Sequence, residues 1–136
     1  MCGVDIDEAV ISVARANYRE SNLHFEVGDA TTINIAGVFN TIILSNVLEH
    51  IAERTAFLLK LRHVYNPNTI LIRVPNFERD WRVPLKRELG IDYRLDKTHH
   101  IEHTPNSLIE ELKSAQIIAS NIEYRWGEIW VIAHPS

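Results

Sequence analysis

Glycine is scarce in this sequence, and the spacing of the few glycines excludes the usual nucleotide-binding loops. The 136 residues include only five glycines, and the two closest, Gly28 and Gly37, are nine positions apart. A dinucleotide-binding loop needs the pattern G-x-G-x-x-G, and a phosphate-binding loop needs G-x-x-x-x-G-K. Neither loop can therefore occur anywhere in this chain.

Cysteine, basic charge and long apolar runs are also scarce. Cys2 is the only cysteine, so the chain cannot form a disulfide on its own, and we expect a reducing, cytoplasmic setting. The 18 Asp and Glu residues outnumber the 14 Lys and Arg residues, which argues against a nucleic-acid partner. No apolar run approaches the ~20 residues of a membrane-spanning helix, so we expect no insertion into a membrane.

What the sequence does contain is the pattern of a single folded domain over residues 1–136. Hydrophobic residues make up 46% of the chain, enough for a core without disulfides or metal ions. Strand-like segments are short, apolar and β-branched, and lie at 1–5, 23–27, 38–44, 69–74, 118–125 and 128–133. Helix-like segments repeat apolar residues every three or four positions, and lie at 8–19, at 52–65 and after Thr104-Pro105.

This alternation predicts an α/β fold with a mostly parallel sheet that has helices on both faces. The 38–44 strand is almost wholly apolar or β-branched, so we expect it to be buried on both faces. A tight turn at Trp126-Gly127 joins the last two strands, which makes the final strand antiparallel to its neighbour. Residues 76–104 have no steady period, and we expect a lid or an insertion there with a short helix near 80–89.

Acidic and polar residues follow the predicted strands at the points where the strands end. Ligands of open α/β sheets bind at this edge, which here holds Asp5, Asp29, Ser45 and Asn46. A carboxylate at this edge can accept two hydrogen bonds from a ribose diol, which suits Asp5, or one from an exocyclic amine, which suits Asp29. Asp5 could equally cap the next helix, and Asp29 could belong to a simple turn. Together the two acids favour a pocket for a purine nucleoside.

Three segments resemble, in order and in spacing, successive motifs of the class I S-adenosylmethionine-dependent methyltransferases. They are Gly3-Val4-Asp5-Ile6-Asp7, Val27-Gly28-Asp29-Ala30 and Ile43-Leu44-Ser45-Asn46-Val47-Leu48-Glu49-His50-Ile51. Three later segments resemble the small-molecule methyltransferases of that superfamily: Val74-Pro75-Asn76-Phe77, Leu95-Asp96-Lys97-Thr98-His99 and Thr104-Pro105-Asn106-Ser107-Leu108. The resemblance implies a Rossmann-like fold with strand order 3-2-1-4-5-7-6, in which only strand 7 is antiparallel.

The resemblance also implies a cofactor, S-adenosylmethionine, and a small-molecule methyl acceptor. The residues that would bind the cofactor lie just after three of the strands. They are Asp5 at the ribose hydroxyls, Ile6 on the adenine, Asp29 at the adenine amino group, Ala30 as a backbone contact, and Ser45 and Asn46 at the methionine end.

The family's first strand and its glycine-rich loop have no counterpart in this sequence, which begins at the equivalent of the second strand. The missing strand is the central one of the family's sheet. We therefore expect the strand that ends at Asp5 to pair directly with the 38–44 strand, or to borrow a strand from a second copy in a homodimer. A gap is disfavoured because it would leave backbone groups unpaired.

The three histidines of residues 99–103 suggest either a metal site or a catalytic role. His99 and His103 would share one face of a helix, as zinc ligands often do, but Thr98 and Thr104-Pro105 favour a loop. No cysteine or second cluster completes a ligand set, so we expect no metal ion.

A role in catalysis suits His99 or His100 better, because either could position the substrate or accept its proton. His50 lies near the end of the third motif, after its strand, and is explained as an ordinary polar residue at the start of a helix. The many charged residues of the 76–104 segment are explained as a solvated lid whose charges pair with one another.

Two other functions stay open. The missing strand allows a non-enzymatic domain that keeps the methyltransferase fold and acts in oligomerisation or partner binding. Asp5-x-Asp7 after a strand, with Ser45 at the next site, also fits the nucleophile and the acid of a phosphatase-like hydrolase. That class needs a later acidic pair after a strand, where this chain has Pro75-Asn76.

Overall fold

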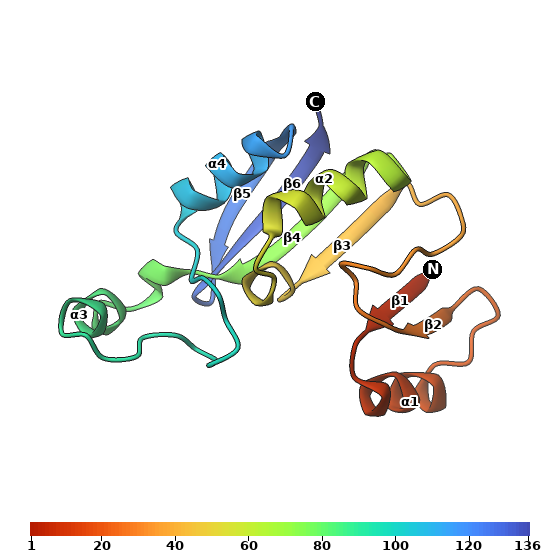
Figure 1. Cartoon of the computed structure of the whole chain (residues 1–136), viewed down its shortest axis with the longest axis horizontal. Helices are drawn as coiled ribbons and strands as arrows, with labels where there is room; N and C mark the ends of the chain where they lie inside the picture. Colours follow the sequence, from red (N-terminus) through yellow and green to blue (C-terminus); the bar gives the residue numbers. More distant parts are fainter. The chain divides into compact units, whose positions relative to one another are not determined.

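The strands of this chain form two sheets. The computed structural model describes residues 1–136, which divide into two units, Met1–Gly37 and Val38–Ser136. The first unit holds the two-stranded sheet β1-β2, and the second holds the four-stranded sheet β3-β4-β6-β5 (Figure 1). Each unit therefore has its own sheet and its own helices.

The first unit consists, in chain order, of β1 (Cys2–Asp5), α1 (Glu8–Asn17) and β2 (His24–Val27), and its two strands pair in parallel. The helix begins at Glu8, as predicted, and Asp7 caps it, because its side chain accepts a hydrogen bond from the backbone N–H of Ala9 at 2.8 Å. Ile11 is the one buried hydrophobic side chain of this unit, at 2% exposure. The unit has the strand–helix–strand connection of a parallel sheet but very little core of its own.

The second unit contains the other four strands. β3 (Thr41–Ser45) and β4 (Thr69–Pro75) are parallel, and β6 (Glu128–Pro135) runs antiparallel to both β4 and β5 (Ile117–Arg125). Its helical segments are η1 (Leu48–His50), α2 (Arg54–Tyr65), η2 (Phe77–Arg79), α3 (Arg82–Glu88) and α4 (Pro105–Ser114). None of the helices in the chain is both long enough and apolar enough to cross a membrane.

The sheet of the second unit is covered by helices of that unit on one face only. α2 and α4 lie on the same side of it (Figure 1), and alternate strand residues point toward them, with Ile70 and Ile129 fully buried. On the opposite face Ile43 is 62% exposed and Ile132 is 39% exposed. The prediction that the 38–44 strand is buried on both faces is wrong, because β3 is an edge strand and this face carries no helix of the unit.

The strand order agrees with the order that the resemblance implied. In the family's numbering, β2-β1 are strands 3-2 and β3-β4-β6-β5 are strands 4-5-7-6, and strand 7, here β6, is antiparallel. Each sheet thus follows its own part of the implied order, and neither contains a counterpart of strand 1. The expected direct pairing between the strand that ends at Asp5 and the 38–44 strand is wrong, because β1 and β3 belong to separate sheets and no ladder joins them.

The predicted helix start and hairpin turn near the end of the chain are confirmed. The Thr104 hydroxyl accepts from the Ser107 N–H at 3.1 Å, and the Ser107 hydroxyl accepts from the Thr104 N–H at 2.9 Å, so the two form a capping box. Trp126 and Gly127 both have positive φ, 52° and 79°, as a tight turn between β5 and β6 requires. The short helix expected near 80–89 is α3.

Candidate functional site

Asp5 and Asp29 lie at the carboxyl ends of two neighbouring parallel strands in the first unit. Asp5 ends β1 and pairs with the last residue of β2, and the next residue, Gly28, donates its N–H to the Asp5 carbonyl at 2.9 Å. One carboxylate oxygen of Asp5 accepts the backbone N–H of Asp7 at 2.8 Å. Asp29 accepts from the N–H and the hydroxyl of Thr31 at 2.8 and 2.7 Å. The two acids predicted to bind a nucleoside therefore share one edge of one sheet.

The residue after each acid also lies at this edge. Ile6 is 73% exposed, which leaves an apolar surface beside Asp5 on which a flat ring can pack. Ala30 is half-buried in the turn that begins at Asp29. The carboxylate of Asp7 caps α1 instead of facing this edge, so the phosphatase-like interpretation loses its second acid.

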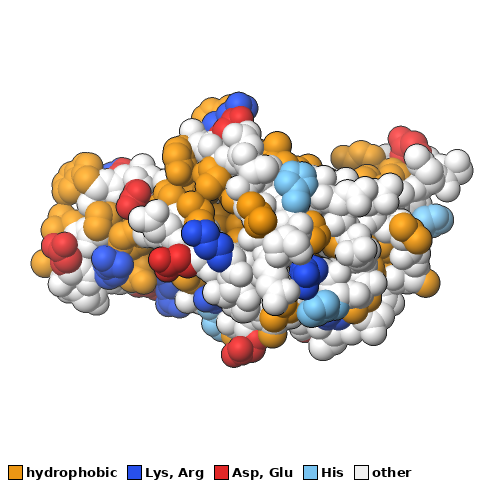
Figure 2. Space-filling view, turned by 90° about the horizontal axis from the view of Figure 1, so that it is seen from above, with side chains coloured by type: hydrophobic (Ala, Val, Ile, Leu, Met, Phe, Trp, Pro, Cys, Tyr) orange, Lys and Arg blue, Asp and Glu red, His pale blue; other side chains and the backbone are white.

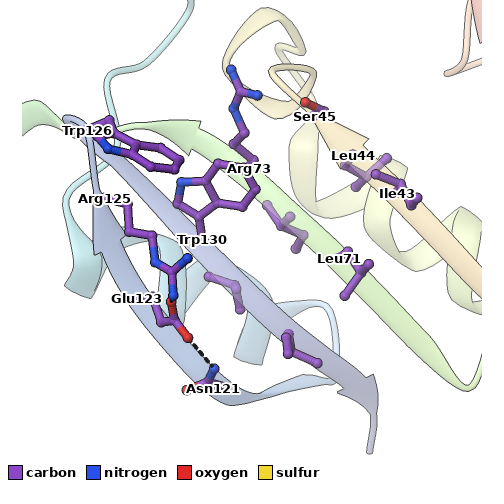
Figure 3. Close-up of a pocket in the computed structure, with 13 residues that line it drawn as sticks. Ile43, Leu44, Ser45, Leu71, Arg73, Asn121, Glu123, Arg125, Trp126 and Trp130 are labelled. Carbon is purple, nitrogen blue, oxygen red and sulfur yellow. Dashed lines mark hydrogen bonds and ion pairs between the residues drawn. The ribbon is translucent and has the colours of Figure 1, made fainter.

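Ser45 and Asn46 lie in the second unit, at the carboxyl end of β3. Asn46 adopts a left-handed conformation with φ 53°, and its N–H donates to the Arg73 carbonyl at 2.9 Å. Ser45 lines a groove of about 450 Å³ on the face of the sheet that α2 and α4 leave uncovered (Figure 3). Within that groove Arg73 pairs with Glu128 at 2.9 Å and lies 5.2 Å from the centre of the Trp130 ring. The groove is thus a largely apolar surface with two paired cations, since Arg125, which also lines it, pairs with Glu123.

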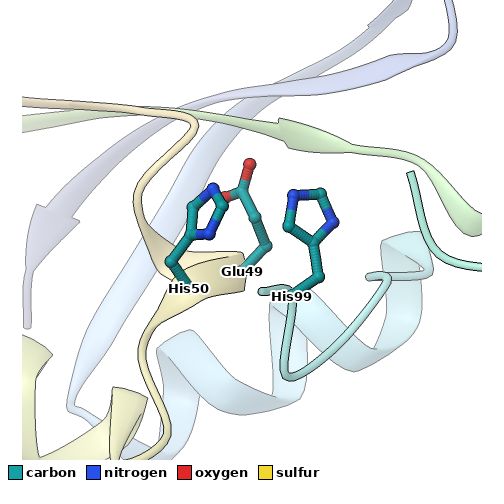
Figure 4. Close-up of side chains that lie close together, drawn as sticks. All are labelled: Glu49, His50 and His99. Atoms are coloured by element: carbon teal, nitrogen blue, oxygen red, sulfur yellow. The ribbon is translucent and has the colours of Figure 1, made fainter. Parts of the chain in front are cut away.

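Three further side chains of the second unit converge where η1 meets the 76–104 segment. The candidate ligand atoms of Glu49, His50 and His99 all lie within 4.8 Å of one another, and Figure 4 shows the Glu49 carboxylate between the two imidazole rings. The rings of His50 and His99 are 4.6 Å apart, edge to face. Glu49 is 1% exposed, and neither of its carboxylate oxygens has a hydrogen-bond partner.

Burial changes the proton affinity of this cluster. It raises the pKa of Glu49 above its ordinary value of 4.5, although the nearby His99 acts in the opposite direction. Burial and the neighbouring His99 lower the pKa of His50 below its ordinary value of 6.5. Glu49 therefore keeps a proton more readily, and His50 less readily, than either would in water.

Of the two histidines expected to be catalytic, the structure places only His99 in this cluster. His99 is 5% exposed, and its Nδ1 forms a hydrogen bond with Glu102 at 2.8 Å. The side chain of His100 is exposed, and its backbone N–H donates to the Glu49 carbonyl at 2.7 Å. The catalytic role of either histidine stays a prediction.

His103 belongs to a different network. It is fully buried, its Nε2 forms a hydrogen bond with Glu111 at 2.9 Å, and Glu111 also accepts from Arg54 at 2.7 Å. Residues 98–104 form a loop, as predicted, so His99 and His103 do not share a helix face. This network ties the loop to α4 and to the start of α2.

Half of the Asp, Glu, Lys and Arg residues of the 76–104 segment form ion pairs with one another, in the manner expected for a self-paired lid. The pairs are Arg79–Glu102, Arg82–Asp80 and Arg94–Asp92. Hydrogen bonds from Arg94 lower the pKa of Asp92 to about 2, so this exposed pair is charged at neutral pH. On the face of the molecule in Figure 2, Lys and Arg side chains are interspersed with Asp and Glu.

Glu49 and His50 are the residues of the cluster that sequence reasoning missed. The available signal was the adjacent pair itself, an acid and a histidine a few residues beyond the end of a predicted strand. Such a pair is common at the start of a helix, so the sequence alone gave no reason to place it with His99.

The family of the chain follows from its sequence profile. A family described as a methyltransferase domain matches residues 1–127. The chain belongs to this family. The resemblance to class I S-adenosylmethionine-dependent methyltransferases is confirmed, and so is the Rossmann-like α/β fold class. S-adenosylmethionine is the cofactor of this family.

Solved methyltransferase structures share the fold at low sequence identity. Magnesium protoporphyrin IX methyltransferase (ChlM) from Synechocystis PCC 6803, with bound SAH, gives a TM-score of 0.72 at 15% identity over 99% of this chain and 64% of that one. An O-methyltransferase (NcsB1) from neocarzinostatin biosynthesis gives a TM-score of 0.74 at 15% identity, and the match covers 99% of this chain and 42% of that one. An S-adenosylmethionine-dependent methyltransferase from Mesorhizobium loti gives a TM-score of 0.72 at 14% identity, and the match covers 98% of this chain and 79% of that one. No curated protein matches the chain.

Proposed function

We propose that this chain takes part in S-adenosylmethionine-dependent methyl transfer to a small-molecule acceptor. The observation that carries the proposal is the shared edge of Asp5 and Asp29, which end neighbouring parallel strands. At such an edge Asp5 can accept from both ribose hydroxyls while Asp29 accepts from the adenine amino group. Ile6 then packs on the adenine, and the N–H of Ala30 contacts a ring nitrogen.

Methyl transfer depends on alignment more than on covalent help from the protein. The acceptor's electron pair forms the new bond to the methyl carbon as the carbon–sulfur bond breaks, and the sulfonium becomes a neutral thioether. Holding the three atoms in line supplies most of the rate, and a base is needed only when the acceptor must lose a proton. Ser45 and Asn46 hold the methionine end in this proposal, and His99 or His100 positions the acceptor or takes its proton.

Two solved relatives support a small molecule as the acceptor. ChlM is named as a methyltransferase of magnesium protoporphyrin IX, and NcsB1 was solved with SAH and 1,4-dihydroxy-2-naphthoic acid. The Lys and Arg residues of the 76–104 segment favour the same class, because Arg79, Arg82 and Arg94 are paired with acids of the chain itself. Such pairing reduces the positive charge that this segment offers to a polyanionic acceptor.

Calorimetry with S-adenosylhomocysteine tests the cofactor site. We expect saturable binding that Asp5→Ala and Asp29→Ala each weaken by at least about tenfold, a loss of ~1.4 kcal/mol. Glu20→Gln is the matched control, because Glu20 is an exposed acid of the same unit away from this edge, and it should bind like the parent. No heat from this chain, and none after a glycine-rich segment is added before Met1, would overturn the proposal.

A non-enzymatic module that acts by self-association is the second candidate, and the uncovered face of the β3-β4-β6-β5 sheet favours it. Ile43, Ile118 and Ile132 are 62%, 56% and 39% exposed there, and exposed apolar side chains that gather on one face are typical of interfaces. Sedimentation velocity at several concentrations tests it. A concentration-dependent dimer that Ile43→Asp abolishes, in a chain that binds no S-adenosylhomocysteine, would favour the module over the enzyme.

A further inference from the structure

The Glu49 carboxylate is buried, and no other residue donates a hydrogen bond to it. It is 1% exposed, and both of its oxygens lack a hydrogen-bond donor. A buried carboxylate in this state is costly unless it is protonated or faces a cation. Its nearest polar neighbours are the imidazoles of His50 and His99, so the protonation state of these rings decides what the carboxylate faces.

The hydrogen bonds of His50 fix which of its nitrogens carries the proton. Thr98 donates its single hydroxyl proton to Asp96 at 2.7 Å. The Thr98 oxygen can therefore only accept from His50 Nδ1, which lies 2.9 Å away. A neutral His50 then has its proton on Nδ1 and a lone pair on Nε2.

His99 is fixed in the same way. Its Nδ1 lies 2.8 Å from Glu102, which also accepts from Arg79 at 2.5 Å and from the N–H of Leu95 at 2.7 Å. Because both oxygens of Glu102 already accept, one from Arg79 and the other from Leu95, Glu102 acts as the acceptor, so a neutral His99 donates from Nδ1 and keeps a lone pair on Nε2. The two imidazole lone pairs and the Glu49 carboxylate thus face a common space, with their candidate ligand atoms within 4.8 Å of one another.

We propose that Glu49, His50 and His99 form a binding site for a divalent transition-metal ion such as Zn²⁺. Two imidazoles with one carboxylate are a ligand set of such ions, whereas Mg²⁺ and Ca²⁺ prefer oxygen ligands. Zinc lies about 2.0–2.2 Å from nitrogen and oxygen ligands, so side-chain movements of about 1 Å bring these atoms into place.

The surroundings have the features of a metal site. Each histidine donates its other ring N–H to a fixed acceptor, Thr98 for His50 and Glu102 for His99, which is the usual second layer around histidine ligands. Three protein ligands leave at least one coordination position open, as in catalytic zinc sites. The ion joins η1 to the 76–104 segment, so it also stabilises the folded chain. The expectation of no metal ion considered the 96–103 cluster alone and left out Glu49 and His50.

Cobalt titration of the tag-free chain tests this site without any cofactor, so its outcome is independent of the proposed methyl transfer. We expect visible absorption that saturates at one Co²⁺ per chain, is removed by Zn²⁺ and is unaffected by excess Mg²⁺. Glu49→Gln, His50→Gln and His99→Gln should each weaken binding by at least about tenfold. His63→Gln is the matched control, because His63 is an exposed histidine on α2 outside the cluster, and it should leave binding unchanged.

Thermal unfolding separates loss of the site from loss of the fold. The amide of Glu49→Gln can donate to the two imidazole lone pairs, so the metal-free variant should unfold at or above the temperature of the parent. Zn²⁺ should raise the unfolding temperature of the parent and leave that of Glu49→Gln unchanged. The proposal fails if Co²⁺ does not saturate at one ion per chain, if Mg²⁺ displaces it, or if the three variants bind as tightly as the parent. A proton on Glu49 would then account for its burial.

Discussion

The two units of the chain differ sharply in how much apolar side chain they bury. The first unit buries Ile11 alone, whereas every other buried hydrophobic residue, from Leu44 to Ala133, belongs to the second. The acids proposed to hold the nucleoside stand on the unit with little core, and the Glu49 cluster stands on the unit with a packed one. Cofactor binding and global stability should therefore respond to different sets of mutations.

The largest difference is expected from truncating a core residue. Ile70 on β4 is fully buried under the helices, and Ile70→Ala should lower the free energy of unfolding by about 3 kcal/mol through lost burial and a cavity. Val10 on α1 of the first unit is 50% exposed, so Val10→Ala should cost less than about 0.5 kcal/mol. Urea unfolding followed by circular dichroism measures both. Equal losses would mean that the first unit is packed far better than its exposures indicate.

The Arg54–Glu111–His103 network should give the next largest effect. Burial raises the pKa of Glu111, but the hydrogen bond from His103 and the charge of Arg54 outweigh it, and the net pKa lies below the ordinary 4.5. Glu111→Gln should cost about 2 kcal/mol at pH 7, because it removes the negative charge that faces a largely buried Arg54.

The sign of the pH dependence follows from the lowered pKa of Glu111. A carboxyl whose pKa is lower in the folded chain stabilises it above the unfolded value, and this contribution is lost as the pH falls through the folded value. The difference in unfolding free energy between parent and Glu111→Gln should thus be full at pH 7 and shrink below about pH 4. A difference that is the same at pH 7 and pH 3.5 would rule out this assignment.

The features of the fold that were predictable from sequence depend on residues close together in the chain. The Asp7 cap, the Thr104-Pro105 helix start and the Trp126-Gly127 turn each involve a few adjacent positions. The exposure of Ile43 depends on which elements cover its face of the sheet, and no pattern within 38–44 carries that information. The apolar run therefore predicted a strand correctly and its burial wrongly.

The same distinction applies to the site. Asp5 and Asp29 could be predicted because the ends of strands are visible in the hydrophobic pattern, and parallel pairing brings such ends together. The place of Glu49 in the site could not be predicted, because its neighbours come from a segment about 50 residues further along the sequence. The backbone N–H of His100, in that segment, donates to the Glu49 carbonyl. That the Glu49 carboxylate is buried and accepts no hydrogen bond from another residue can be seen only in the folded structure.

Helix caps allow the two units to be compared with matched changes. Thr104→Ala removes the side-chain half of the capping box of α4 and should cost about 1 kcal/mol of global stability. Asp7→Ala removes the corresponding bond to Ala9 in the first unit. It should reduce the helix signal in circular dichroism while shifting the global urea midpoint less than Thr104→Ala does. A larger shift of the urea midpoint for Asp7→Ala than for Thr104→Ala would contradict the idea that the second unit carries most of the stability.

The smallest effect on stability, with a large effect on binding, is expected at Asp5. Its carboxylate accepts the backbone N–H of Asp7, and the side-chain oxygen of Asp5→Asn can keep that bond, so the free energy of unfolding should change by less than about 0.5 kcal/mol. The neutral amide loses the charge-assisted hydrogen bonds to the ribose hydroxyls, so affinity for S-adenosylhomocysteine should fall at least about tenfold. Calorimetry measures the affinity for S-adenosylhomocysteine, and urea unfolding of the same preparation measures the free energy of unfolding. A variant that loses stability and affinity together would show that Asp5 acts through the fold of its unit, whereas loss of affinity alone identifies it as a ligand-binding residue.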